Sequence, residues 1–368
     1  MKITYMIDSM LPGGKERQLF YLIRELSSIY SIQLIILNKS IHFKGLYTLP
    51  IKMVTIDQNQ KYAIRSIAKI NKCLKEFKPD IMHHYDIVSQ LISIPYILWY
   101  HPYVINGSIR YAGNLKKTIL FRVLQKIAYK TADKIISNSK MGLGVEGFEN
   151  SKNALVIHNG IDKYNINNSS GETPLVNKYI ETPRKFNFVM VGRFYDLKDY
   201  VTYIRSAIIL LKDKHDVGFY CIGDGPSLAK AKEEAGSYLD NGIYFLGQRN
   251  DVQDLLKYFD VGVLLNDTNG HAEGISNAIM EFMAAGLPVI ATNAGGTPEI
   301  MQNEITGYLV PAFDENYVAN RMAAFMDSPE LKSNMGKNGK KRIENDFSIL
   351  KMVEAYNSLY EDMMNDVR

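Results

Sequence analysis

Residues 261–300 constrain the fold of this chain more than any other stretch of the sequence. Val261–Leu265 is a short apolar run, which is typical of a buried strand. A helical pattern from Ile275 to Ala285 follows it and ends at Gly286, where a glycine just past the last turn is expected. A second short apolar run then begins at Pro288. This order of strand, helix and strand predicts a βαβ unit of a parallel sheet.

Two polar loops follow the two predicted strands. The first covers residues 266–271, and the second, residues 293–296, contains a pair of glycines. Thr297-Pro298-Glu299 after the second loop is typical of a helix start. Ligands of parallel sheets bind at the carboxyl ends of the strands, so we expect both loops to border a ligand site.

Two glutamates in this stretch, Glu273 and Glu281, stand eight residues apart. On a helix this separation corresponds to roughly 12 Å, about the length of a sugar nucleotide. Unpaired amides and the helix dipole favour phosphate at the predicted helix start, which comprises Gly274, Ile275, Ser276 and Asn277. Glu281 would then accept hydrogen bonds from a ribose while Glu273 faces the transferred group. Taken alone, the two glutamates also fit an acidic first-turn residue and a solvated one.

The wider pattern resembles that of the group 1, GT4-type retaining glycosyltransferases. Members of that family carry two glutamates eight positions apart, then A-x-G-x-P-V-I-A-T, then G-G-x-x-E. The chain matches this pattern with Glu273 and Glu281, residues 284–292 and residues 295–299. The resemblance covers nearly the whole chain and is strongest over residues 186–312.

The length of 368 residues exceeds a usual single-domain core and favours two domains. The resemblance implies the GT-B architecture, in which two doubly wound α/β domains with parallel sheets face each other across a cleft. We expect an acceptor-binding domain over residues 1–165, a linker over 166–184, a donor-binding domain over 185–346, and a last helix over 347–368 that packs back on the first domain.

Two cations follow the apolar run Phe186–Val191. Arg193 and Lys198 precede a helix predicted over residues 199–212, and cations at a strand end suit a diphosphate. A structural salt bridge is the alternative, but the residues match the family's V-G-R-x4-K. The resemblance implies that both cations stabilise charge on the leaving phosphate. The chain has no D-x-D cluster, so we expect neither a metal nor another cofactor.

Gly13 and Gly14 lie between a strand predicted over residues 2–7 and a helix predicted over about 16–30. A glycine pair lets backbone amides approach a ligand, although a tight turn has the same pattern. The segment G-G-x-E-R resembles the family's N-terminal glycine loop. That resemblance implies a position over the donor phosphates and the reacting sugar.

His83 and His84 are successive residues of a predicted strand. Their side chains should point to opposite faces of the sheet, which disfavours a shared metal ion. The segment resembles the family's P-D-I-x-H-x-H, with His83 at the first histidine and Tyr85 in place of the second. We therefore assign His83 to substrate binding and leave open whether Tyr85 has an acceptor-side role.

Arg110 follows a strand predicted over residues 103–109. Many members of the family carry a histidine near this strand end, close to the reacting sugar. A guanidinium here can hold a phosphate or carboxylate of the acceptor, and a surface salt bridge is the alternative.

The charge is unevenly distributed. Residues 1–165 contain 23 Lys and Arg against 11 Asp and Glu, a net charge of +12, whereas residues 166–368 carry −8 and the whole chain +4. A basic amphipathic helix predicted over residues 114–131 adds to this and can rest on anionic lipid. An ordinary core helix with a solvated face is the alternative. Nucleic acid is disfavoured, because no recognition module accompanies the basic residues.

The remaining features favour the cytoplasm. No apolar run reaches the ~18 residues of a membrane span, and the first residues are typical of a strand rather than a secretory signal. Cys73 and Cys221 lie far apart and form no metal motif, which fits a reducing compartment. We therefore expect a cytoplasmic protein that associates peripherally with the inner face of a membrane.

By resemblance, the chain is expected to be a hexosyltransferase-type enzyme that retains anomeric configuration. It would move a sugar from a nucleotide-diphosphate donor, with a UDP-sugar favoured, to a hydroxyl of a glycan or lipid-linked acceptor in capsule, O-antigen or exopolysaccharide assembly. Two alternatives remain open: a nucleotide-sugar epimerase of the same fold, and a non-catalytic glycan- or membrane-binding module.

Overall fold

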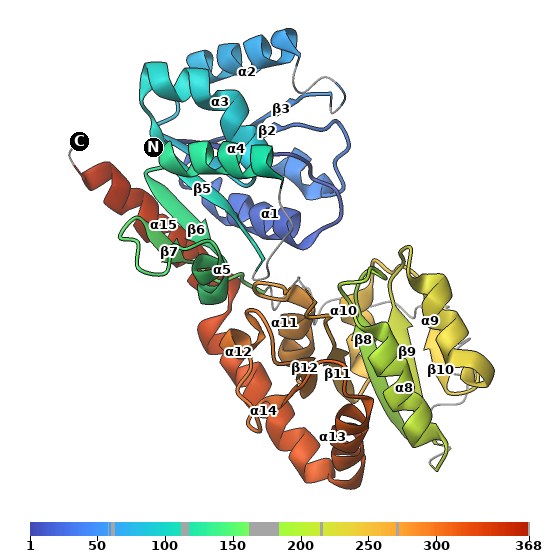
Figure 1. Ribbon diagram of the computed structural model, residues 1–368. Helices are drawn as coiled ribbons and strands as arrows, with labels where there is room; N and C mark the ends of the chain where they lie inside the picture. Colours follow the sequence, from blue (N-terminus) through green and yellow to red (C-terminus); the bar gives the residue numbers. More distant parts are fainter. Residues whose placement is uncertain are drawn as a thin grey trace. The chain divides into compact units, whose positions relative to one another are not determined.

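The computed structural model describes residues 1–57, 59, 63–111, 118–161, 184–213, 216–269 and 272–366 (Figure 1). The chain forms two compact units. The first comprises Met1–Arg110, Leu115–Gly160 and Ile349–Arg368, and the second comprises Tyr111–Asn114 and Ile161–Ser348. Apart from Arg184, the linker predicted over residues 166–184 lies outside the described residues.

The first unit contains a seven-stranded sheet in which neighbouring strands are parallel. Across the sheet the strands are β3 (Ile51–Thr55), β2 (Ser31–Ile36), β1 (Lys2–Ile7), β4 (Ile81–His84), β5 (Tyr103–Ile109), β6 (Lys134–Ser137) and β7 (Ala154–Val156). The helices are α1 (Gly14–Leu26), η1 (Lys44–Thr48), α2 (Ile64–Phe77), α3 (Ile87–Tyr100), α4 (Ile119–Lys130), α5 (Lys140–Val145) and α15 (Ile349–Asn365).

Alternating side chains of these strands enter two hydrophobic cores, one on each face of the sheet. On β1, Tyr5 packs into a core shared with helices α1 and α15, whereas Met6 packs into a second core with α2, α3 and α4. Helix α15 belongs to the first unit because Tyr356, Tyr360 and other apolar residues of this helix are buried in the first of these cores.

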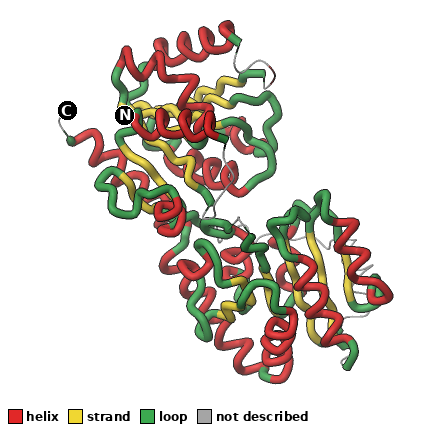
Figure 2. Tube along the Cα trace, in the orientation of Figure 1, coloured by secondary structure: helices red, strands yellow, loops and turns green. Residues whose placement is uncertain are grey.

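The second unit contains a six-stranded sheet, again with parallel neighbours. Its strands are, in order, β10 (Ile243–Phe245), β9 (Val217–Ile222), β8 (Phe186–Val191), β11 (Val261–Leu264), β12 (Val289–Thr292) and β13 (Gly307–Val310). Its helices are α8 (Tyr200–Leu211), α9 (Leu228–Ala235), η3 (Gly236–Tyr238), α10 (Val252–Leu255), η4 (Leu256–Tyr258), α11 (Asn277–Ala284), α12 (Thr297–Ile300), α13 (Glu315–Asp327) and α14 (Pro329–Asp346). Helices surround the strands of both sheets (Figure 2).

Each sheet contains one point at which the direction of strand addition reverses. The reversal lies between β1 and β4 in the first sheet and between β8 and β11 in the second. Ligands of doubly wound sheets bind outside the carboxyl ends of the strands at such points. The structure confirms the doubly wound α/β prediction. The loops after these four strands are therefore the expected places for ligands.

Two helices of the first unit, α1 and α4, differ from the predicted ones. Helix α1 ends at Leu26 rather than near residue 30, because Ser27 and Ser28 favour local hydrogen bonds over a continued helix. Helix α4 begins at Ile119 rather than 114, and the Thr118 hydroxyl caps it by accepting from the Phe121 amide. Lys116 and Lys117 lie outside the described residues. Within the described chain, no helix combines the length and the apolar character that crossing a membrane requires.

Candidate active site

The loops after β8 and β11 bring a lysine and a glutamate together at the reversal point of the second sheet. Lys198 Nζ lies 2.8 Å from Glu273 Oε1 and donates to Asn266 Oδ1 at 2.8 Å. Lys198 and Asn266 also form an antiparallel bridge through their backbones. Both predicted site residues, Lys198 and Glu273, are therefore in direct contact.

Local hydrogen bonds hold Lys198 at this position. The Asp199 side chain caps helix α8 by accepting from the Thr202 amide at 2.9 Å, and the Asp199 amide donates to the carbonyl of Leu265. Asn266 is fixed in turn, since its amide donates to the Thr292 hydroxyl at 3.0 Å. The loop is thus tied to strands β11 and β12 before any ligand arrives.

Glu273 is ionised by its surroundings. Burial alone would raise the pKa of its carboxyl, but the Lys198 ammonium outweighs burial and the pKa lies below the ordinary value. Oε2 of Glu273 is buried and has no hydrogen-bond partner among the described residues. The carboxylate therefore retains capacity to accept a hydrogen bond from a ligand hydroxyl.

The second glycine loop holds the backbone of Glu273. Gly296 donates its amide to the Glu273 carbonyl at 3.0 Å. Gly295 has φ +59°, and a Cβ there would lie 2.2 Å from the same carbonyl oxygen. Both the left-handed backbone and the close approach require glycine. The two glycines of the sequence pattern, Gly295 and Gly296, thus hold the backbone of Glu273 in place.

The predicted start of the central helix is wrong by two residues. Helix α11 begins at Asn277 with Ser276 as its extended N-cap, so Gly274 and Ile275 precede the helix. Glu273 forms an antiparallel bridge with Tyr111 and accepts from Gly296, which keeps this segment extended. The predicted separation of the two glutamates along a helix axis therefore does not apply.

The other predicted residues of the second unit are placed separately. Gly274, Ile275 and Ser276 are buried next to the start of α11, and Glu281 is buried within that helix. Arg193 is exposed in the loop between β8 and Lys198. This arrangement puts a cation, a helix start and the Lys198–Glu273 pair on segments that follow β8 and β11.

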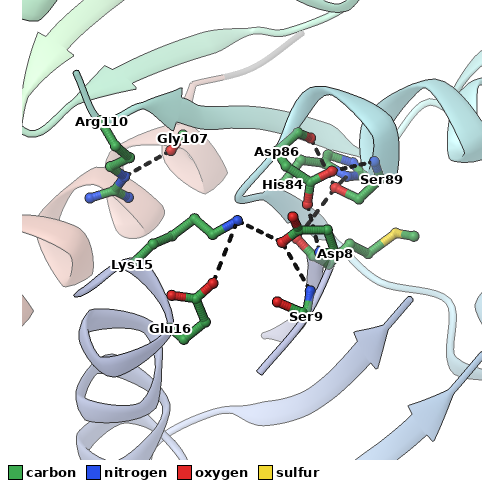
Figure 3. A network of polar contacts seen from close by, with 10 residues as sticks. Asp8, Ser9, Lys15, Glu16, His84, Asp86, Ser89, Gly107 and Arg110 are labelled. Atoms are coloured by element: carbon green, nitrogen blue, oxygen red, sulfur yellow. Dashed lines mark hydrogen bonds and ion pairs between the residues drawn. The ribbon is translucent and has the colours of Figure 1, made fainter. Parts of the chain in front are cut away.

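A second charged cluster lies at the reversal point of the first sheet (Figure 3). Lys15 Nζ lies 2.6 Å from Asp8 Oδ1 and 3.9 Å from Glu16 Oε1. Asp86 caps helix α3 by accepting from the Ser89 amide, and it accepts from the Asp8 amide at 2.8 Å. Gly13 caps helix α1 in an extended conformation and Gly14 begins that helix, so the predicted glycine loop lies directly before Lys15.

The two histidines lie on opposite faces of the first sheet, as predicted. His83 Nδ1 lies 2.8 Å from the Tyr360 hydroxyl, whereas His84 contacts Ser89 and Ser93. Burial lowers the pKa of His84 to about 3 and holds that of His83 well below the ordinary value. Both rings are therefore neutral. Within the described ranges, no group of three or more His, Cys, Asp or Glu side chains is placed to hold a metal ion.

Several residues of these sites were not singled out from the sequence. Asn266 and Gly295 support the Lys198–Glu273 pair, and Asp8 and Asp86 surround Lys15. A usable signal existed, because Asp8, Asp86 and Asn266 each follow within two residues of the end of a predicted strand. Tyr360 carried no comparable signal, since its contact with His83 joins residues 277 positions apart.

Comparison with known proteins agrees with this arrangement. The model of the glycosyl transferases group 1 family matches residues 175–342, and that of the glycosyl transferase 4-like family matches residues 14–139. The chain belongs to the group 1 glycosyltransferases. The two matches together cover about four-fifths of this glycosyltransferase and include Lys15, Lys198 and Glu273.

Individual relatives align over most of the glycosyltransferase. It is 27% identical over 319 residues to the UDP-Gal:alpha-D-GlcNAc-diphosphoundecaprenol alpha-1,3-galactosyltransferase of Escherichia coli, which covers 82% of this chain and 80% of the relative. It is 22% identical to the O-antigen chain mannosyltransferase C of Escherichia coli, with 84% of each chain covered.

Solved structures share the fold. Anabaena HepE, crystallised with UDP and glucose, superposes with a TM-score of 0.83 and 18% sequence identity, covering 98% of this chain and 100% of HepE. The GT-B fold predicted from the sequence is thereby confirmed.

Proposed function

We propose that this glycosyltransferase moves a sugar from a UDP-sugar to a hydroxyl of a lipid-linked or glycan acceptor, with retention of anomeric configuration and without a metal ion. Residues 1–165 would bind the acceptor and residues 185–346 the donor. The names of the relatives support this proposal: the Escherichia coli galactosyltransferase uses UDP-Gal and a diphosphoundecaprenol acceptor, and other relatives act in O-antigen and capsule synthesis.

The Lys198–Glu273 contact at the reversal point of the second sheet carries the proposal. Lys198 and Arg193 would stabilise the negative charge that develops on the leaving diphosphate, together with the amides of Gly274–Asn277. Glu273 would orient the transferred sugar through its unoccupied Oε2, and Glu281 would bind the ribose. Gly13 and Gly14 would approach the donor phosphates with their amides.

Bond changes in the proposed reaction are balanced without a further reactant. The acceptor oxygen bonds to the anomeric carbon on the face from which the diphosphate leaves. The bond between that carbon and the phosphate oxygen breaks, and the hydroxyl proton passes to the departing phosphate. Glu273 is not a nucleophile in this scheme, because its ion pair with Lys198 lowers its basicity.

The exposed face of helix α4 supports a peripheral position on an anionic membrane. Ile119, Leu120 and Val123 are 83%, 69% and 49% exposed, and Arg122 and Lys126 lie on the same helix. Apolar insertion combined with basic side chains binds anionic lipid surfaces. Replacing Ile119 and Val123 by serine should release the enzyme from anionic vesicles in co-sedimentation; unchanged sedimentation would contradict this part of the proposal.

The test of the function begins with thermal shifts against UDP, GDP, ADP and dTDP, with and without EDTA. A ligand that binds the native state raises the melting temperature, so UDP should stabilise the enzyme in both conditions. Glu273→Ala should keep UDP binding and lose most transfer, whereas Glu281→Ala should weaken UDP binding. Glu233→Ala, at an exposed position on α9, is the matched control.

The stereochemistry and the reaction class are read from the product. NMR of the transferred sugar should show the donor's anomeric configuration. Conversion of the nucleotide sugar without any acceptor would instead indicate an epimerase. Absence of a shift with any of the four diphosphates would contradict the proposed donor class.

A further inference from the structure

Arg110 is a half-buried cation whose contacts in the first unit are with neutral groups. Its Nε donates to the Gly107 carbonyl at 2.9 Å, and its terminal nitrogens contact Asn159 Oδ1 and the Tyr356 hydroxyl, both at 3.4 Å. Its guanidinium also lies over the Tyr85 ring, 5.0 Å from the centroid. The terminal nitrogens carry four of the five N–H groups, and contacts of 3.4 Å are long for hydrogen bonds.

No carboxylate among the described residues pairs with Arg110. The nearby acidic side chains are engaged elsewhere: Asp8 and Glu16 lie against Lys15, and Asp86 accepts backbone amides (Figure 3). Arg110 is half-buried, so its guanidinium loses part of its hydration, and neutral acceptors and an aromatic ring offset that loss only weakly. The surroundings of Arg110 therefore favour an anion that the protein itself does not supply.

His83 points a second polar group toward the same place. The ring is fully buried, and its Nε2 has no hydrogen-bond partner among the described residues. When the Tyr360 hydroxyl donates to Nδ1 at 2.8 Å, Nε2 carries the proton and becomes a donor. Tyr360 can act as that donor because the Tyr5 hydroxyl, 3.1 Å away, can donate to it in turn.

Gly107 leaves space between these two groups. A Cβ at this position would lie 2.7 Å from His83 Nε2 and 3.4 Å from the outer nitrogen of Arg110. The absent side chain thus opens one small region onto both Nε2 and the guanidinium. Strands β4 and β5 hold the residues in register, with His83 paired to Ile105.

We propose that Arg110, His83 and the Tyr356 hydroxyl bind a phosphate group of the acceptor. This inference rests on the proposed function and adds the chemical class of the acceptor, which is a phosphorylated or diphosphate-linked molecule. A planar carboxylate is satisfied by the guanidinium fork alone, whereas three donors, on β4, just after β5 and on α15, suit a tetrahedral oxyanion. The neutral Tyr356 hydroxyl supplies a donor without adding charge.

The test measures oxyanion binding with the donor site saturated by UDP. Inorganic phosphate, pyrophosphate and glucuronate are titrated calorimetrically into the full-length wild type and into Arg110→Met, Gly107→Ala and Arg65→Met. Arg65 is an exposed arginine on α2 and is the matched control. Arg110→Met should weaken phosphate binding at least about tenfold, because charge-assisted hydrogen bonds are lost. Gly107→Ala should do the same while keeping the charge.

Each outcome has a defined meaning. Phosphate binding that is weakened in Arg110→Met and Gly107→Ala but kept in Arg65→Met supports the site. Equal binding in all four proteins, or none in the wild type, overturns it, and tighter binding of glucuronate than of phosphate assigns the site to a carboxylate instead. If Arg110→Met does not fold, Arg110→Lys keeps the charge without the fork and should still bind more weakly.

The UDP titration separates the two proposals. UDP binding without a phosphate response would overturn the acceptor site and leave the donor proposal intact. A wild type that binds phosphate through Arg110 but no nucleoside diphosphate would contradict the proposed function alone.

Discussion

Lys15 and Lys198 occupy equivalent places in the two sheets but have different electrostatic surroundings. Each lysine follows the first strand of its sheet, and each contacts a carboxylate at the point where strand order reverses. Lys198 has one carboxylate partner, Glu273, and one neutral partner, Asn266. Lys15 faces the carboxylates of Asp8, Asp86 and Glu16.

The pKa shifts of the charged groups in the two clusters reflect this difference. Burial raises the pKa of Asp86 above its ordinary value, and Lys15 offsets burial only in part. The pKa of Lys15 is itself raised, because the attraction of Asp86 and Asp8 outweighs the effect of burial. The pKa of Glu273 is lowered, because Lys198 outweighs burial there. Lys198 therefore neutralises a single carboxylate, whereas Lys15 faces more carboxylates than one ammonium can neutralise.

This contrast separates the chemistry of the two sites. The cluster around Lys15 has an excess of carboxylates and favours hydrogen-bond donors such as sugar hydroxyls. The Lys198–Glu273 pair is balanced, and the exposed Arg193 on the same loop makes its surroundings favourable for a diphosphate. The same strand topology thus carries two different charge distributions on the loops at its reversal points.

The largest expected effect is on transfer by Lys198→Ala. Removing one preorganised donor to the leaving group should lower kcat by about 10²- to 10³-fold. The measurement is transfer from labelled UDP-sugar at saturating donor, with Lys185→Ala as the control because Lys185 is a lysine exposed at the start of the second sheet. Activity within threefold of the wild type would show that Lys198 only holds Glu273.

The second effect concerns the stability of Lys15→Met. This change leaves Asp8 and Asp86 without their cation and should lower the free energy of unfolding by about 1 kcal/mol, because the Asp8 side chain is 44% exposed and solvent screens the pair. Combining it with Asp86→Asn should restore part of the loss, since the two residues share one network. Urea denaturation of the wild type, both single variants and the double variant measures this coupling. Strictly additive changes would mean that the cluster is not a coupled unit.

The smallest effect is a difference in acid response between Glu273→Gln and Asp86→Asn. Because the folded pKa of Glu273 is lowered, its stabilising contribution is present above about pH 4.5 and is lost as the pH falls below that. Because the folded pKa of Asp86 is raised, stability from this group decreases as the pH rises from 3.8 through the folded pKa.

Urea denaturation between pH 3 and pH 7 measures how the free energy of unfolding depends on pH for both variants. The stability advantage of the wild type over Glu273→Gln should grow with rising pH in the acid range, whereas its advantage over Asp86→Asn should shrink. If the free energies of unfolding of the two variants changed with pH in the same way relative to the wild type, the two lysine clusters would not differ electrostatically as described.

Local sequence patterns were sufficient for most elements and for several site residues. The apolar runs at Lys2–Ile7, Phe186–Val191 and Val261–Leu264 became strands, because short apolar runs bounded by turns are stable only when buried in a sheet. Lys198 and Glu273 follow two of these runs and match the family pattern, so both were identifiable as candidates before their contact was known.

The sequence by itself determined the succession of strands and helices, since periodicity, capping residues and glycines act over a few residues. Tertiary structure alone decided which groups meet. Backbone contacts with Gly296 and Tyr111 keep Glu273 outside helix α11, although its spacing from Glu281 predicted a position within that helix. Helix α15 brings Tyr356 into contact with Arg110, although the two residues are 246 positions apart in the sequence. Such contacts depend on the packing of whole elements, which no local pattern encodes.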